Sequence, residues 1–201
     1  TVQPNRPPTL DPIGNLTLAY SSAPQTVTLT GLSPGAPGEN QRLAITTVSS
    51  NPALMPVPAV SYTNPNATGS LVLRPTANAS GTAVLTVTVN DGGKTNNLVT
   101  RSFTVTVQPN RPPTLDPIGN LTLGYNAAAQ TINLSGIGPG ASGEIQKLSV
   151  TASSDNPELV SNPSTSYHSP GATGTLTVKP VANASGTAVI TVMVNDGGKT
   201  N

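Results

Sequence analysis

The sequence predicts an all-β protein made of two similar domains in tandem, and three observations support this. Residues 1–18 read TVQPNRPPTLDPIGNLTL, and residues 106–123 spell the same letters 105 positions later. The chain of 201 residues contains 19 glycines and 21 prolines, which favours frequent turns. Hydrophobic residues reach 35% and fall in short runs that alternate with polar residues, which is typical of strands with one buried face.

The repeat predicts the domain boundaries. NASGTAV at residues 78–84 returns at 183–189, and NDGGKTN at 90–96 returns at 195–201. A period of this length exceeds a solenoid unit and matches a domain that can bury its own core. We therefore expect a tail of a preceding repeat at residues 1–5, repeat 1 at 6–107, a Pro-rich linker at 108–112 and repeat 2 at 113–201.

Five segments of repeat 1 carry the strand pattern. Residues 82–90 and 102–107 are the clearest, with Leu85, Val87 and Val89 on the inward side of the first. The inward set of the second is Phe103, Val105 and Val107. The other three segments are residues 26–32, 43–48 and 70–74. Gly, Asn and Pro separate these runs, and Asp91-Gly92 is typical of a hairpin connection. About seven strands per hundred residues favours an immunoglobulin-like β-sandwich.

Residues 107–113, VQPNRPP, join the two copies. Three prolines in so short a segment favour an extended, stiff linker. We expect two sandwiches joined end to end with limited bending. Identical linkers would set identical angles in a regular array.

The 201 residues lack a counterpart in repeat 2 of residues 97–105, NLVTRSFTV. These residues form most of the predicted last strand of repeat 1. We therefore expect repeat 2 to lack the strand that pairs with residues 187–195, which leaves an unpaired edge and an open apolar slot. The strand follows in the same polypeptide, comes from a neighbouring chain, or is missing from a weak repeat; the first reading is favoured.

Composition excludes several classes of function. Charged residues make up 8% of the chain with a net charge of +1, so nucleic acid is not an expected partner. No apolar run approaches the roughly 20 residues of a membrane helix, so we expect no membrane insertion in this segment. The single histidine, His168, is matched by Thr63 in repeat 1 and is expected in an exposed loop. We expect no enzyme activity, no catalytic residue and no buried titratable group.

Two pairs of tyrosines match across the copies. A sugar-binding face would need exposed aromatic side chains. Because the sequence is poor in Phe and Trp, we expect the tyrosines to pack at the corners of the sandwiches instead. They are Tyr20, Tyr62, Tyr125 and Tyr167.

Residues 86–115, TVTVNDGGKTNNLVTRSFTVTVQPNRPPTL, resemble the last hairpin and linker of bacterial Ig-like and cadherin-like repeats. Such repeats form long arrays in large secreted or surface-attached proteins. The likeness extends over nearly all of both copies, through VNDGG, the N-x-PP linker and ANASGTAVLTVTVND. It implies a spacer, adhesive or matrix role rather than catalysis.

The resemblance also raises the question of calcium, because cadherin linkers ligate calcium through Asp and Asn. Asn110 fits that pattern, and Asp91 and Asp116 are nearby carboxylates. Calcium prefers six to eight oxygen ligands, usually with several carboxylates, and such a set is absent here. We therefore expect no cofactor, with calcium as the weaker alternative and Asp91 acting as a turn residue. Arg6 and Arg111 are alternative partners for an acidic turn residue.

Six sites match the Asn-x-Ser/Thr pattern, and Asn78 and Asn183 are the best glycosylation candidates because they fall in predicted exposed turns. Without knowledge of the host we do not expect them to be modified.

The sequence favours a non-enzymatic structural repeat module of a long secreted or cell-surface array, such as a stalk, adhesin shaft or filament. Neighbouring copies of the same repeat would be its partners, with self-association into fibres, because low net charge promotes association. The alternative is an accessory carbohydrate- or protein-binding module of a secreted enzyme. Many further copies of the repeat in the full gene would favour the first.

Overall fold

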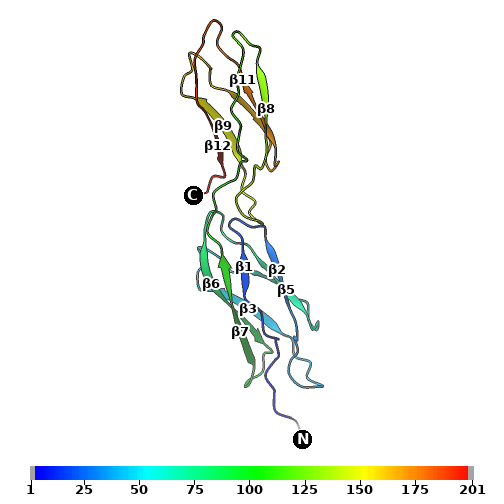
Figure 1. Cartoon of the computed structure of the whole chain (residues 1–201). Helices are drawn as coiled ribbons and strands as arrows, with labels where there is room; N and C mark the ends of the chain where they lie inside the picture. Colours follow the sequence, from blue (N-terminus) through cyan, green and yellow to red (C-terminus); the bar gives the residue numbers. More distant parts are fainter. Residues whose placement is uncertain (1–2, 199–201) are drawn as a thin grey trace. The chain divides into compact units, whose positions relative to one another are not determined.

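The computed structural model describes residues 3–198, in which there are twelve strands (Figure 1). The chain divides into two compact units, unit 1 (Thr1–Pro109) and unit 2 (Asn110–Asn201). No described residue lies in a helix, so none belongs to a helix long and apolar enough to cross a membrane. The all-β prediction is confirmed. Residues 1–2 of the predicted tail of a preceding repeat (1–5) and residues 199–201 of predicted repeat 2 lie outside the described residues.

Unit 1 is a sandwich of two sheets. One sheet has the order β1 (Leu16–Leu18), β7 (Leu98–Val107), β6 (Gly81–Asn90) and β3 (Ala44–Ser49). The other has the order β2 (Gln25–Leu29), β5 (Gly69–Leu73) and β4 (Ala59–Ser61). Only the pairing of β1 with β7 is parallel. This division of seven strands between two sheets is that of an immunoglobulin-like sandwich.

The core of unit 1 lies between the two sheets and follows the predicted alternation. Leu85, Val87 and Val89 of β6 are fully buried. They share one cluster with the inward residues of β7 and with the leucines of β2 and β5. The alternate residues of β6 and β7 face outward, where Thr86 Oγ1 and Ser102 Oγ lie 2.9 Å apart in a cross-strand hydrogen bond.

Unit 2 repeats part of this plan. One sheet has the order β10 (Ser164–Tyr167), β11 (Gly174–Val178) and β8 (Gln130–Leu134). The other pairs β12 (Ile190–Asn195) with β9 (Ser149–Ser154). With the 105-residue offset, β8, β9, β10, β11 and β12 correspond to β2, β3, β4, β5 and β6. Residues 121–123 match β1 but lie in no strand.

Leu85 and Ile190 occupy matching positions but differ in burial, and this gives a first prediction. Leu85→Ala removes a fully buried side chain and should lower the free energy of unfolding of unit 1 by about 2–5 kcal/mol. Ile190→Ala removes a side chain that is only partly buried, so its cost to unit 2 should be smaller. Urea unfolding followed by methyl NMR signals assigned to each unit measures both values. Equal losses in the two units would contradict the burial assigned to Ile190.

Candidate functional site

The turn between β6 and β7 buries a carboxylate. Asp91 is only 3% exposed although it lies in a turn. Its Oδ1 accepts a hydrogen bond of 2.8 Å from the Gly93 N–H, while Asn90 Oδ1 accepts one of 2.7 Å from the Gly92 N–H. These local bonds define the turn, which Gly92 enters with a φ of 78°. The carboxylate therefore organises the reversal of the chain.

Asn5 ties this turn to the start of unit 1. Its Nδ2 donates to Asp91 Oδ2 at 3.2 Å and to the Thr95 carbonyl oxygen at 2.9 Å. Its Oδ1 accepts a hydrogen bond from Gln41 Nε2. A Cβ added at Gly93 would overlap the Asn5 side chain, so the glycine makes this approach possible. We call Asn5, Gln41, Asp91 and Gly93 the polar clamp of unit 1.

Unit 2 builds the same clamp from Asn110, Gln146, Asp196 and Gly198. Asn110 Nδ2 donates to Asp196 Oδ2 at 3.0 Å, and Asp196 Oδ1 accepts a hydrogen bond of 2.8 Å from the Gly198 N–H. Gln146 Nε2 donates to Asn110 Oδ1. Asp196 is 3% exposed and Asn110 is 9% exposed. Each clamp residue of unit 1 thus has its counterpart 105 positions later, so the clamp belongs to the repeat itself.

The expectation of no buried titratable group is wrong. Asp91, Asp196 and Glu144 are buried. Backbone N–H groups and amide side chains donate to both oxygens of Asp91 and of Asp196, whereas Glu144 accepts at Oε2 from the Ala141 N–H and its Oε1 has no partner among the described residues. The sequence predicted Asp91 as a turn residue and gave no sign of its burial. The Asn–Asp pairs were missed because 86 residues separate their members. The only sign of these pairs in the sequence was that the asparagine and the aspartate both recur in the second copy.

The three calcium candidates do not form a ligand set within either unit. Asp91 and Asn110 belong to the clamps of different units. Asp116 is exposed and accepts a hydrogen bond of 2.7 Å from Ser135 Oγ. Residues 3–198 contain no group of three or more His, Cys, Asp or Glu residues that could hold a metal ion. Protein N–H and O–H groups donate hydrogen bonds to the carboxylates of Asp91, Asp116 and Asp196.

The arginines do not take the predicted role among the described contacts. Arg6 and Arg111 are exposed. Arg6 meets Glu39 through its backbone N–H, which donates to Glu39 Oε1 at 3.1 Å. The other oxygen of Glu39 accepts a hydrogen bond of 2.8 Å from the Ala36 N–H. This glutamate therefore binds the entering backbone rather than a guanidinium group.

The glycosylation candidates lie in exposed turns. Asn78 and Asn183 have φ values of 59° and 64°. The Asn183 Oδ1 accepts hydrogen bonds from Asn126 Nδ2 at 3.2 Å and from the Tyr125 hydroxyl at 3.4 Å. Modification at either asparagine stays a prediction. His168 is also exposed.

The tyrosines depart from the expected corner packing at one position. Tyr20 is buried, and the half-buried Tyr62 donates its hydroxyl to Asn64 Oδ1 at 3.3 Å. Burial raises the pKa of the Tyr62 hydroxyl above its ordinary value. Tyr125, which matches Tyr20, is 67% exposed, so the prediction is wrong there. The residues before Tyr20 form β1 against β7, whereas those before Tyr125 lie in no strand.

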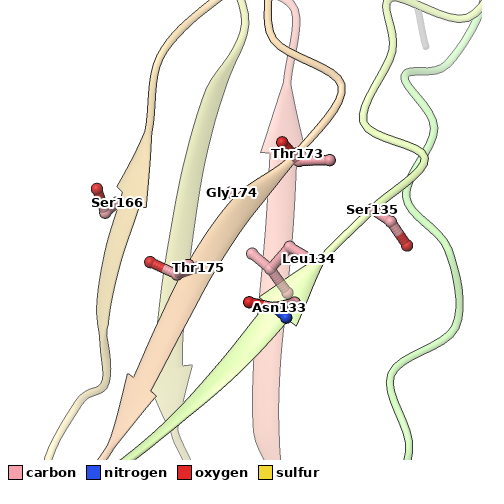
Figure 2. Close-up of a pocket in the computed structure, with 7 residues that line it drawn as sticks. All are labelled: Asn133, Leu134, Ser135, Ser166, Thr173, Gly174 and Thr175. Atoms are coloured by element: carbon pink, nitrogen blue, oxygen red, sulfur yellow. The ribbon is translucent and has the colours of Figure 1, made fainter.

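A surface hollow of about 410 Å³ lies on unit 2 over β8, β10 and β11. Figure 2 shows the residues that line it: Asn133, Leu134, Ser135, Ser166, Thr173, Gly174 and Thr175. Ser166, Thr175 and Asn133 are neighbours across the three strands. The lining offers hydroxyl and amide groups but no titratable side chain. It can make hydrogen bonds, and it holds no general acid or base.

Comparisons with known proteins give structural likeness only. No protein-family model matches the chain, and no curated protein matches it. Domains 4 and 5 of the S-layer protein SbsC match at 21% identity over 94% of this chain and 93% of that one, with a TM-score of 0.40. An endo-fucoidan hydrolase of glycoside hydrolase family 107 matches at 20% identity over 99% of this chain, with a TM-score of 0.43.

A nucleoside hydrolase-related hypothetical protein from Saccharophagus degradans matches at 18% identity over 52% of this chain, with a TM-score of 0.34. This chain spans 28% of the fucoidan hydrolase and 26% of the protein from Saccharophagus degradans. These likenesses concern the arrangement of strands. None of the activities in those names is carried over to this chain.

The polar clamp gives a second prediction. Asn5→Ala leaves the Asp91 carboxylate and Gln41 Nε2 without their partner, so unit 1 should lose about 1–3 kcal/mol in free energy of unfolding. Asn66→Ala changes an exposed turn residue and should stay within about 0.5 kcal/mol of the parent. Chemical denaturation of both variants gives the comparison. Two equal losses would show that Asn5 adds nothing beyond an ordinary surface residue.

A third prediction concerns metal. Because hydrogen-bond donors already occupy the Asp91 and Asp196 carboxylates, millimolar calcium should leave both melting temperatures unchanged relative to a chelator. Differential scanning calorimetry with and without calcium measures this, with magnesium as the control ion. A calcium-specific rise of several degrees would contradict it, since a ligand that binds only the folded state must stabilise that state.

Proposed function

We propose that this chain is a non-enzymatic structural repeat module of a long extracellular or cell-surface array. The observation that carries the proposal is the polar clamp, built twice with the same residue types at one offset. Each clamp fastens the segment that enters a unit to the last turn of that unit. A repeat that fixes its own entry segment is suited to act as a spacer.

The junction between the units supports this role. The Gln108 N–H donates to the Leu18 carbonyl oxygen of unit 1 at 2.8 Å. Asn110 is held in the clamp of unit 2. Only Pro109 lies between these anchored residues, and its ring fixes φ. Few backbone torsions therefore remain for reorientation, which favours a stiff stalk, shaft or filament over a flexible tether.

The remaining features of the proposal follow from composition and surface. A net charge of +1 and outward-facing threonines suit packing against neighbouring copies and self-association into fibres. We place the module outside the cell, secreted or at the cell surface, without a cofactor and without nucleic acid as a partner. Catalysis has no place in this proposal.

A second candidate is an accessory carbohydrate- or protein-binding module of a secreted enzyme. The hydroxyl- and amide-lined hollow of unit 2 favours it (Figure 2). No aromatic side chain lines the hollow, so it lacks the stacking surface that sugar rings usually use. Micromolar binding on a glycan array, lost in Thr175→Val, would favour the accessory module over the spacer.

The short junction gives a fourth prediction. In the parent chain the two units should tumble together, because Pro109 alone separates the anchored residues. Insertion of Gly-Gly-Ser after Pro109 should let each unit tumble separately while both clamps stay intact. Nitrogen-15 relaxation measures the rotational correlation time of each unit. The same insertion after the exposed Pro37 is the control and should leave the tumbling unchanged. Independent tumbling in the parent would refute the stiff spacer.

A further inference from the structure

Each unit contains a chain of hydrogen bonds that ends at an open acceptor. In unit 2, Asn110 Nδ2 donates to Asp196, and Asn110 Oδ1 accepts from Gln146 Nε2. Because its nitrogen faces Asn110, the Gln146 amide presents its carbonyl oxygen on the other side. Gln146 Oε1 is buried and has no hydrogen-bond partner among residues 3–198. Gln41 of unit 1 ends the corresponding chain in the same way.

Two further buried oxygens of unit 2 lack partners. Glu144 is 7% exposed, and its Oε2 accepts a hydrogen bond of 3.4 Å from the Ala141 N–H. Glu144 Oε1 and the Tyr167 hydroxyl have no hydrogen-bond partner in the described part of the chain. No described cationic side chain pairs with Glu144. Because burying a carboxylate with so few donors is costly, a ligand that brings donors and positive charge is favoured there.

The corresponding residues of unit 1 line one hollow of about 310 Å³. Its polar lining includes the counterparts of the three unit 2 residues with open oxygens, which are Glu39, Gln41 and Tyr62. Its apolar lining comprises Leu32, Pro34, Leu43 and Pro65, with the counterparts Ile137, Pro139, Leu148 and Pro170 in unit 2. The repeat thus combines a carboxylate, an amide oxygen and a phenol with apolar walls. We call this set of residues the acceptor pocket of each unit.

We propose that the acceptor pocket of unit 2 binds a primary ammonium group on an unbranched alkyl stem. An ammonium group has three N–H donors and no acceptor. One donor each would go to Glu144 Oε1, Gln146 Oε1 and the Tyr167 hydroxyl oxygen. The positive charge would balance the Glu144 carboxylate, and the apolar walls would pack along the methylene stem. This ligand site does not depend on the structural role proposed above.

Water and metal ions fit the acceptor pocket less well. A water molecule is neutral, so it would leave the carboxylate without a counter-charge. Its share of liquid volume, about 30 Å³, is also far smaller than the hollow of about 310 Å³ in unit 1. Calcium prefers roughly six to eight oxygen ligands, and the open oxygens of unit 2 are fewer. An ammonium group matches both the charge and the number of acceptors.

The acceptor pocket of unit 1 should bind the same group more weakly. There Glu39 Oε1 already accepts a hydrogen bond of 3.1 Å from the Arg6 N–H, and Oε2 accepts one from the Ala36 N–H. Glu39 is also half-buried, whereas Glu144 is buried. A carboxylate that has more donors and more water around it gains less from a bound cation. The two units therefore provide a comparison within one molecule.

The first experiment titrates n-butylammonium, which is the lysine side chain without its backbone, into the 201-residue chain. Amide NMR signals of residues 144–148 and 167 should shift saturably, and those of residues 39–43 and 62 only at higher concentration. The control ligands are n-butanol, which lacks the charge, and butyltrimethylammonium, which lacks N–H donors. Equal shifts with either control would overturn the proposal. Saturation of unit 1 before unit 2, or no saturable shift, would overturn it as well.

A second measurement distinguishes two sources of the ammonium group, a free alkylamine and a lysine of a second copy. Lys94, Lys147 and Lys179 are exposed, so a second copy has lysines to offer. Sedimentation is followed at rising chain concentration with and without n-butylammonium. Dimers that n-butylammonium disperses would assign the group to a second copy. Binding of n-butylammonium that leaves the oligomeric state unchanged would assign it to a free amine.

Conservative variants identify the acceptors. Glu144→Gln keeps an acceptor for the Ala141 N–H but removes the charge, so it should weaken n-butylammonium binding to unit 2 about 10- to 100-fold. Tyr167→Phe removes only the hydroxyl and should weaken binding about 2- to 10-fold. Glu158→Gln, at an exposed glutamate of the same unit, is the matched control and should leave binding unchanged. Undiminished binding in Glu144→Gln and Tyr167→Phe, with the amide spectrum of unit 2 retained, would overturn the proposal.

Discussion

Unit 1 depends on the antiparallel pairing of β6 with β7. This one pairing holds residues 81–84 in a strand, holds β1 in the sheet through β7, and brings the inward residues of β7 into the core. Phe103, the only phenylalanine of the chain, enters the core by this route. The core of unit 1 consists almost entirely of leucine and valine. Because it holds few large side chains, its stability depends on each strand covering the apolar residues of its neighbours. At roughly 25 cal/mol per Å² of apolar surface buried, the surface that β7 covers contributes a substantial part of the free energy of unfolding of unit 1.

The polar clamp is the second constraint. It acts through hydrogen bonds to a buried carboxylate, whereas the pairing of β6 with β7 acts largely through the burial of apolar side chains. A buried carboxylate is costly unless hydrogen-bond donors surround it. Asp91 and Asp196 obtain those donors from the backbone of their own turn and from an asparagine 86 residues earlier. The requirement fixes the position of the entering segment more sharply than apolar contact would, because hydrogen bonds are directional. The turn that precedes the closing strand and the segment that enters the unit are therefore set by the same carboxylate.

The sequence was sufficient to predict the strands in which apolar and polar residues alternate over five or more positions. The segments predicted at 82–90 and 102–107 correspond to β6 and β7, and the other three predicted segments correspond to β2, β3 and β5. It did not predict β4, because three residues are too few to show a period of two. The clamp was missed for a different reason. Asn5 lies among prolines and Asp91 in a glycine turn, and each residue on its own is typical of an exposed loop. The fold brings the two residues together, so that Asp91 becomes buried and Asn5 half-buried, and no local stretch of the sequence shows this contact.

Comparing the two copies shows how far the local sequence determines the secondary structure and burial of a segment. Residues 16–18 and 121–123 are both Leu-Thr-Leu within eighteen identical letters, yet only the first set forms a strand. The difference is the partner of β1, which begins its register at Val105, 89 residues away from Leu16. Tyr20 and Tyr125 differ in burial in the same way. Residues of the repeated segment 106–123 thus take part in both units. Residues 106–108 complete an edge of the unit they leave, while Asn110 fastens the unit they enter. The division between the two units, at Pro109, therefore falls inside the repeated segment, because the residues on its two sides pair with different units.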